Sequence, residues 1–489
     1  MRISVGIALL LLFSAAAYAD STRVEVYTNG DANPAVSSYA NPGDAWNTAY
    51  GFSAAGRTVK LVLGSDWSHD MELALKANSR IEIDLNGHYI KRNRGLSQKS
   101  HGGVFYLNEG ATLVLRDSNP KIMGYDGIRG GVVTGGASSD TAGAVHVKSN
   151  AVFIMEGGTI YECTTADDGG AVQLDGAGSR FTMTGGRIYY CQTINSTDEC
   201  SGGGLYVDQG TAEISNAIFD SCYSEDYGGA IFSYRGAVTL NNVHFCGNRA
   251  RNSGGAIYVG LDLKSYDATC LTASDCLFTN NNAGDHGGAV GINDNADDGK
   301  PMVFRNCTFR MNHSDDNGGA VWIDDTHVVL SDVTITGNSA DGHGGGVYVD
   351  SRYDVTLKGL TRIEENRGGK DNCHNLTLQD GISTRAYVYN AGLYEGSRVG
   401  INSTSAGDQP LSKKIAVYQA EKYYFADAGT LRFDELEETV STPVYSSIFG
   451  NGSTVVIIVL LLLGLLVLSG VILTQRIKKR KATAGKEAQ

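Results

Sequence analysis

The chain has 489 residues, with 40 Lys and Arg against 53 Asp and Glu, and a formal net charge of -13. This acidic balance argues against nucleic acid as a partner, because phosphate binding needs faces rich in Lys and Arg. With 63 Gly, 6 Pro and alternating apolar positions throughout, the composition excludes a disordered chain and predicts many short strands joined by glycine turns.

The first segment, residues 1–19, has the layout of a secretory signal peptide. Arg2 precedes an apolar run that ends at Phe13, and a small-residue exit that ends at Ala19 follows. The apolar run is too short to span a bilayer, so we expect cleavage before Asp20. An uncleaved anchor or an ordinary buried helix is the alternative.

We expect residues 20–79 to form a cap or the first coils of the repeat region that follows, residues 80–369. In that region a Gly-Gly-small-aliphatic motif recurs at steps of 26 to 33 residues. Such a step indicates one supersecondary unit per repeat. The motifs are GGAV (169–172), GGGL (202–205), GGAI (228–231), GGAI (254–257), GGAV (287–290), GGAV (318–321) and GGGV (344–347), with a degenerate AGAV that begins at Ala142.

A second motif, which we call the anchor motif, begins with Phe or Ile and ends three residues later in Asn in the later repeats. Its first residues are Ile160, Ile188, Phe219, Phe245, Phe278, Phe309, Ile335 and Ile363. In the earlier repeats Cys163, Cys191 and Cys222 replace the asparagine. We expect the asparagines to stack as an inward hydrogen-bonding ladder at one corner of the coils.

Short strands, one turn of chain per repeat and no amphipathic helical stretch leave few architectures. The Leu and Asn spacing of a leucine-rich repeat is missing, and a propeller blade needs four strands and about 40 residues. The sequence therefore predicts an all-β fold, a parallel β-helix whose coils stack about 4.8 Å apart.

After the repeats, residues 370–445 keep strand-like runs, and we expect final coils and a C-terminal cap there, followed by a linker over residues 446–453. Residues 454–474 are uncharged and apolar, and at about 1.5 Å per residue a helix of this length covers the hydrocarbon core of a bilayer. The basic tail, residues 475–489, favours the cytoplasmic side. We therefore expect a single-pass membrane protein at the cell surface, with its N-terminal domain outside.

The paired GGA(I/V) and F-x-x-N motifs of residues 142–366 resemble the repeats of the polymorphic outer-membrane proteins on chlamydial surfaces. They also resemble the repeats of related parallel β-helix surface proteins. The resemblance implies a right-handed β-helix that is displayed on a surface and linked to adhesion. Chlamydial members end in an autotransporter barrel, and the chain after residue 400 is too short for one, so we expect a single helix in its place.

One face of the predicted coils is a candidate ligand-binding face. Strand side chains alternate, so the residue after the inward aliphatic of each Gly-Gly motif must point outward. These outward residues, which we call the aromatic column, are His146, Gln173, Tyr206, Phe232, Tyr258, Gly291, Trp322 and Tyr348. Two residues further along lie Asp175, Asp208, Asn293, Asp324 and Asp350. Aromatic faces flanked by carboxylates suit sugar rings or an extended peptide, although the rings could instead stack only to steady the sheet.

Parallel β-helices also host polysaccharide lyases and glycosidases, which need carboxylates at defined separation or a calcium-binding acidic cluster. The best local candidate is Asp324-Asp325 followed by His327. His343 lies in a column of variable turn residues before the Gly-Gly pair, and we interpret it as one of them. We therefore assign no catalytic residue, and an enzyme is the less favoured interpretation.

A column of carboxylates precedes the Gly-Gly motifs, formed by Asp167, Asp226, Asp285 and Asp316. Stacked carboxylates repel one another unless they are solvated or bridged by a cation. Solvated turn carboxylates are the favoured interpretation, so we assign no metal ligand and no cofactor, with calcium left open.

All nine cysteines lie in the segment expected outside the membrane, where disulfides form. Cys276 and Cys307 each precede an anchor phenylalanine by two residues in adjacent repeats, and so share an inward column. A coil spacing of about 4.8 Å lies within the Cα range of a disulfide, roughly 4.4–6.8 Å. A disulfide and a stack of two buried thiols both fit this arrangement.

These observations favour a membrane-anchored surface adhesin or ligand-binding scaffold, with a glycan or a cell-surface protein as partner. The alternative is a membrane-anchored polysaccharide-active enzyme, a lyase or glycosidase. A deep groove with convergent carboxylates and a basic residue on one sheet would favour the enzyme.

Overall fold

The computed structural model describes residues 21–28, 35–53, 57–93, 100–194, 200–260, 270–293, 301–324, 326–350, 354–370, 374–379, 387–403, 415–416 and 420–427. The predicted signal peptide, linker, apolar segment and basic tail (residues 1–19 and 446–489) lie outside these ranges. Within them, no helix is both long and apolar enough to cross a membrane.

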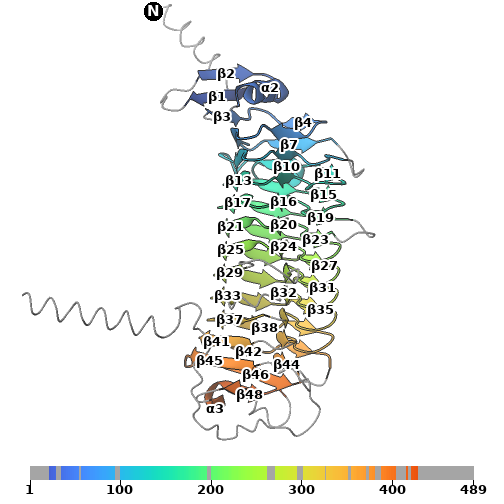
Figure 1. The fold of residues 1–489 in the computed structure, drawn as a ribbon, viewed down its shortest axis with the longest axis vertical. Coiled ribbons are helices and arrows are strands. Elements are labelled where there is room, and N and C mark those ends of the chain that lie inside the picture. The colour runs from blue at the N-terminus through green and yellow to red at the C-terminus, as the bar shows by residue number, and fades with distance from the viewer. Residues whose placement is uncertain are drawn as a thin grey trace, which may run out of the picture. The chain divides into compact units, whose positions relative to one another are not determined.

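From β8 (Phe105–Leu107) to β43 (Arg367–Gly368), each coil contributes one strand to each of four ladders, in the same chain order. In the coil that follows the GGAI motif at 254–257, the strands are β28 (Ile257–Gly260), β29 (Cys270–Ser274), β30 (Leu277–Thr279) and β31 (Asn282–Ala283). The next coil begins with β32 (Val290–Asn293), which pairs in parallel with β28. The predicted all-β parallel solenoid is confirmed, and its coils follow one another along the stack in Figure 1.

The Gly-Gly ladder holds the strands that follow the Gly-Gly motifs, and the anchor ladder those of the anchor motifs. The two ladders join at β46 (Arg398–Ser403), which pairs with strands of both, and together they form a 24-stranded sheet. The remaining Gly-Gly strands are β5 (Leu73–Leu75), β8 (Phe105–Leu107), β12 (Val145–Val147), β16 (Val172–Asp175), β20 (Leu205–Asp208), β24 (Ile231–Tyr234), β36 (Val321–Asp324), β40 (Val347–Val349) and β44 (Leu376–Leu378). The remaining anchor strands are β4 (Trp67–His69), β7 (Tyr89–Arg92), β10 (Val132–Thr134), β14 (Thr159–Tyr161), β18 (Arg187–Tyr189), β22 (Ile218–Asp220), β26 (His244–Cys246), β34 (Thr308–Arg310), β38 (Thr334–Thr336), β42 (Arg362–Glu364) and β48 (Tyr424–Ala426).

The third ladder, the long ladder, has 15 strands, and the fourth, the short ladder, has 9 strands. The long ladder also holds β3 (Arg57–Val62), β6 (Arg80–Asp84), β9 (Thr112–Arg116), β13 (Val152–Met155), β17 (Arg180–Met183), β21 (Thr211–Ser215), β25 (Ala237–Asn241), β33 (Met302–Arg305), β37 (Val328–Ser331), β41 (Asp354–Gly359), β45 (Tyr387–Leu393) and β47 (Ile415–Ala416). The short ladder also holds β11 (Ala137–Ser138), β15 (Thr164–Thr165), β19 (Gln192–Thr193), β23 (Tyr223–Ser224), β27 (Arg249–Ala250), β35 (His313–Ser314), β39 (Ser339–Ala340) and β43 (Arg367–Gly368).

An N-terminal hairpin and helix cover the first coil. In the long ladder, β1 (Thr22–Thr28) pairs antiparallel with β2 (Ala35–Tyr39) and with β3. The helix α2 (Pro42–Phe52) starts at Asn41, whose side chain accepts a hydrogen bond from the Gly43 N–H at 2.7 Å. It buries Ala45, Trp46 and Ala49. The first coil therefore does not present β3 as an open strand edge. A short helix, α3 (Ala420–Tyr423), precedes β48 at the other end.

The core lies inside the coils and follows the predicted alternation. The residue after the third position of each Gly-Gly motif is fully buried, as Val172, Ile257 and Val321 show, and these positions pair in register from coil to coil. The anchor phenylalanines stack as well, with ring centroids 4.9 Å apart for Phe245 and Phe278. Burial of this continuous apolar column is the main stabilising term of the fold.

The predicted asparagine ladder is confirmed. Each amide donates to the side-chain oxygen of the next asparagine, at 2.9 to 3.0 Å, through Asn248, Asn281, Asn312, Asn338, Asn366 and Asn375. The same oxygens also accept the main-chain N–H of the preceding member at 3.0 Å. The earlier coils place Cys222 at this corner, and its N–H donates to Asn248 Oδ1 at 3.0 Å. These buried amides are satisfied only when consecutive coils are in register, which fixes the stacking.

The two glycines of the motif have different roles. Gly254 has φ +72°, a left-handed conformation that residues with a side chain rarely adopt. At Gly255 a Cβ would lie 2.2 Å from the carbonyl oxygen of Gly288 in the next coil. The first glycine therefore makes the turn, and the second lets adjacent coils approach.

Candidate functional site

The aromatic column lies on the outward side of the Gly-Gly ladder, in register from His146 to Tyr348. Its rings are not part of the main core. They form a separate apolar cluster in which Phe232, Tyr258, Trp322 and Tyr348 keep only 9%, 8%, 5% and 4% of their surface exposed. Tyr206 is partly buried against this cluster. The column therefore points outward, but little of its ring surface reaches solvent.

Side chains from the turns before the Gly-Gly pairs stack on these rings. Tyr227 lies 4.5 Å from Tyr258 between ring centroids, and His286 lies 4.7 Å from Trp322, both nearly parallel. The Tyr258 ring in turn fills the space at Gly291, where a Cβ would meet its Cδ2 at 2.8 Å. The sequence showed these turn residues as a variable column. The sequence did hold a sign of this stacking, because several of these turn residues, such as Tyr227 and His286, have aromatic side chains.

The predicted carboxylates lie beside the column, and two of them pair with cations. Asp175 hydrogen-bonds to Lys148 and lies 3.3 Å from His146 Nε2, and these contacts hold its pKa below the usual range. Asp208 Oδ1 accepts a hydrogen bond from Arg235 at 2.9 Å.

Two further predicted carboxylates, Asp324 and Asp350, lie at the same edge and are half-buried. The main-chain N–H of Asp350 donates to Ile323 O, which places Asp350 beside Asp324. The edge of the Gly-Gly ladder therefore carries carboxylates at its two ends, while the coils between Asp208 and Asp324 place Tyr234, Gly260 and Asn293 in this column.

One half-buried carboxyl group in this region was not predicted. Asp168 accepts a hydrogen bond from the Ser201 N–H at 2.7 Å and interacts with the Tyr206 hydroxyl. Burial raises the pKa of Asp168 to about 7. Asp168 is therefore partly protonated at neutral pH, unlike an ordinary surface aspartate.

A second aromatic surface, which we call the tyrosine surface, lies on the outward side of the anchor ladder. It consists of Tyr89, Tyr125, Tyr161, Tyr189 and Tyr190. Neighbouring ring centroids along it lie 4.9 to 6.2 Å apart. Lys91 lies over the Tyr125 ring at 5.0 Å and Arg187 over the Tyr189 ring at 3.7 Å.

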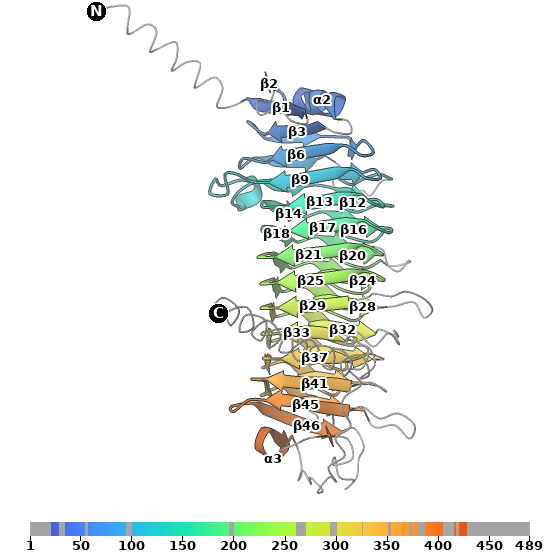
Figure 2. The ribbon, with the colours of Figure 1, turned by 60° about the vertical axis from the view of Figure 1, so that its left-hand side comes forward.

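The tyrosine surface is partly open to solvent, because Tyr190 is exposed and its other four tyrosines are half-buried. Tyr190 is 55% exposed, and Ile122 and Met123 in the hairpin that carries Tyr125 are 45% and 63% exposed. This hairpin lies between β9 and β10 and contains the 3-10 turn η1 (Tyr125–Gly127). Figure 2 shows it in cyan, projecting beside the stack. This surface was not predicted from the sequence, because the anchor motif marks only the inward position and the hairpin breaks the repeat.

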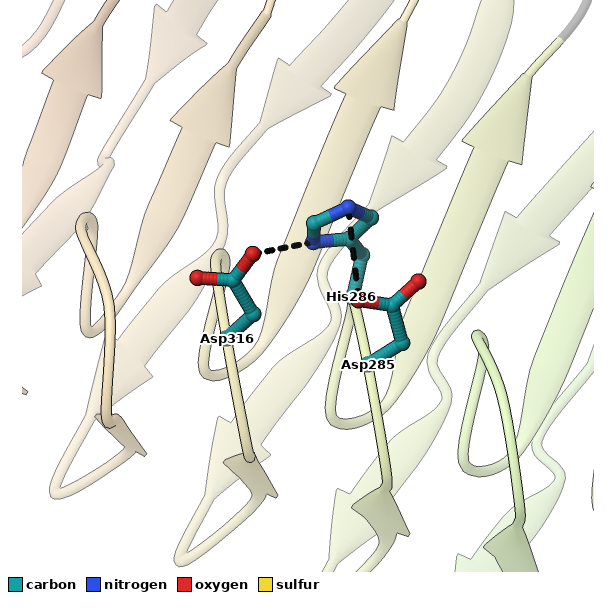
Figure 3. A group of neighbouring side chains, drawn as sticks. All are labelled: Asp285, His286 and Asp316. Carbon is teal, nitrogen blue, oxygen red and sulfur yellow. Dashed lines mark ion pairs between the residues drawn. The ribbon is translucent and has the colours of Figure 1, made fainter.

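A mixed imidazole and carboxylate group lies in the turns between the short and Gly-Gly ladders (Figure 3). His286 Nε2 lies 3.5 Å from Asp285 Oδ1, and His286 Nδ1 lies 3.7 Å from Asp316 Oδ2 of the next coil. A similar group, His313, Asp315 and Asp341, follows it. Stacked carboxylates were expected here, but the imidazoles between them were not.

The predicted cysteine pair is brought together. Ser274 pairs with Arg305 and Leu277 with Thr308, which sets Cys276 beside Cys307 in adjacent coils. Both thiols are buried and in hydrogen-bonding contact with each other. Both are free thiols in this structure, and the disulfide stays a prediction.

The family model of the Chlamydia polymorphic membrane protein repeat matches residues 242–260 and 332–350. The first match spans β26, β27 and β28 and the second β38, β39 and β40. Each match therefore runs from an anchor strand through an asparagine of the ladder to a Gly-Gly strand, which confirms the resemblance. The match indicates a protein of the cell surface or outer membrane with a β-helix fold. No curated protein and no solved structure matches the chain significantly.

Proposed function

We propose that the chain is a membrane-anchored surface scaffold that binds a protein on another surface, as an adhesin does. The repeat match supports display at a surface. The signal peptide of residues 1–19 and the apolar segment of residues 454–474 belong to the proposal, as does a right-handed coil, the hand that parallel crossovers nearly always take.

The tyrosine surface is the observation that carries this proposal. Tyrosine, methionine and arginine are the residue types enriched at protein interfaces. Here Tyr190 and Met123 are exposed, and the underlying strands are held in a rigid ladder, so little conformational entropy is lost on binding. The aromatic column is the weaker candidate, because its rings are nearly covered.

Ring orientation favours a protein partner over a glycan. Tyr161 and Tyr189 stack on each other at 5.3 Å with planes 29° apart, so the faces of these rings are partly occupied. The Tyr161 hydroxyl donates to Asp126 at 2.8 Å. Sugar recognition would rely on open ring faces, and of these tyrosines Tyr190 is the most exposed.

A polysaccharide-active enzyme is the second candidate, favoured by one observation. Asp168, whose pKa burial raises to about 7, lies near Tyr206 and Asp208, and a carboxyl group that keeps its proton near neutral pH can serve as the general acid of a glycosidase. This alternative would be supported if the wild type released reducing ends from a panel of polysaccharides and the Asp168→Asn variant did not.

The proposal is tested with the full chain in fluorescent liposomes and target cells counted by flow cytometry. Protease treatment of the target cells should remove binding, whereas periodate oxidation of their glycans should leave it. Loss of binding after periodate alone would favour a glycan partner. Equal binding with empty liposomes would contradict the proposal.

A further inference from the structure

Three side chains from two consecutive coils converge in the turns that precede β32 and β36 (Figure 3). One ligand atom from each of Asp285, His286 and Asp316 can be chosen so that all lie within 4.8 Å of one another. Two ligands about 2.0–2.2 Å from one tetrahedral ion are roughly 3.3–3.6 Å apart. Small side-chain rotations therefore bring the three atoms to coordination distance.

The turns that carry the group are fixed by the stack. The Asp316 N–H donates to Asp285 O at 3.0 Å, and the Gly287 N–H donates to Asn317 O at 2.9 Å. The imidazole is held as well, because His286 lies at 4.7 Å and 18° from the Trp322 ring. Preorganised ligands lower the entropy cost of binding an ion.

A second observation points to a ligand. Trp322 is only 5% exposed, and within the described residues its indole Nε1 has no hydrogen-bond partner. A buried N–H without an acceptor destabilises the folded state. The ring that carries this N–H stacks on the His286 imidazole, so a water bound to an ion at His286 is a candidate acceptor for it.

We propose that Asp285, His286 and Asp316 bind one divalent ion of the zinc class. One imidazole with two carboxylates is a donor set suited to zinc. Calcium takes six to eight oxygen ligands, which this group does not supply. The side chains of Asp285, His286 and Asp316 are 49%, 21% and 38% exposed, so solvent reaches the fourth coordination position. This inference does not depend on the proposed function.

The charges around the group include one competitor. Lys370 Nζ lies 3.6 Å from Asp316 Oδ1 and would be displaced by the ion. Without the Lys370 ammonium, the carboxylate of Asp316 attracts a cation more strongly. Lys370→Met should therefore tighten zinc binding, while removal of the imidazole should weaken it.

Isothermal titration of the tag-free full chain in detergent with ZnCl2 tests the site. The wild type should bind one equivalent, His286→Asn should weaken binding about tenfold or more, and Lys370→Met should bind more tightly. His313→Asn, in the matched group one coil further on, is the control and should leave the affinity unchanged.

Three outcomes would overturn the proposal. They are no heat of binding by the wild type, unchanged affinity in His286→Asn, or a loss that follows His313 instead of His286. Because His286→Asn also removes the stacked ring, its unfolding temperature is measured in parallel. If that variant does not fold, Lys370→Met decides, since weaker or equal affinity in it contradicts the site.

Discussion

The carboxylate of Asp427 accepts two hydrogen bonds from Asn375, one from the main-chain N–H at 2.6 Å and one from the side-chain amide at 2.5 Å. The Asn375 side-chain oxygen in turn accepts from Asn366. The asparagine ladder, in which each member donates to the next, therefore ends on a group that only accepts when ionised.

Replacing Asp427 with Ala should loosen the last coils. Two donors on the buried Asn375 lose their acceptor, at a cost of about 1–3 kcal/mol. Hydrogen exchange at residues 374–379 should become faster in Asp427→Ala, and less so in Asp427→Asn, which keeps one acceptor oxygen. Unchanged exchange in the alanine variant would show that the ladder does not need this end.

Asp168 should make stability depend on pH. Its folded pKa of about 7 lies above the unfolded value, so between roughly pH 4 and 7 the folded state holds a proton that the unfolded state has lost. Stability from this group is present below the unfolded pKa and falls as pH rises to about 7.

The Asp168→Asn variant isolates this effect. Relative to the wild type, its free energy of unfolding should rise by on the order of 3–4 kcal/mol from pH 4 to pH 7 and then level off. Urea unfolding at a series of pH values measures the difference. A difference that stays constant across this range would mean that Asp168 titrates normally.

Cys276 and Cys307 should form a disulfide when the protein is made in an oxidising compartment. Adjacent coils hold their thiols in contact, and the coil spacing suits disulfide geometry. Peptide mapping without reduction should recover the two cysteines in one linked species, which Cys276→Ser removes. Recovery of both as alkylated thiols would favour the stack of buried thiols.

The rings of the aromatic column should stabilise the folded state. Because Trp322 is 5% exposed and stacks on His286, Trp322→Ala should cost about 3 kcal/mol. Tyr258→Phe keeps the stack with Tyr227 and should cost less than about 1 kcal/mol. Thermal unfolding distinguishes these outcomes, and a wild-type unfolding temperature in Trp322→Ala would mean that the rings do not support the sheet.

The repeats made the register predictable. Alternation along the Gly-Gly strands put Val172 inside and Tyr258 outside, and the anchor motif placed Asn281 at a shared corner, because both follow from sequence period alone. The stacking of Tyr227 on Tyr258 was not predictable. Tyr227 reaches Tyr258 from a turn, and the path of that turn depends on the left-handed conformation of Gly228.

The tyrosine surface shows the same limit. Tyr161 and Tyr189 occupy one outward column, which the register alone could have revealed. Tyr125 comes from an irregular hairpin between β9 and β10, and no repeat position specifies where that hairpin packs. The Asp285 and Asp316 column was visible in the sequence, but the orientation of His286 depends on Trp322 in the next coil.

The most direct test of the account is binding of full-chain liposomes to target cells by the double variant Tyr189→Ala/Tyr190→Ala. The matched control is Tyr394→Ala, a 63% exposed tyrosine in a coil far along the chain. The account predicts that the double variant loses at least about tenfold in affinity, as interface hot spots do, while the control binds as the wild type. Wild-type affinity in a folded double variant would contradict it.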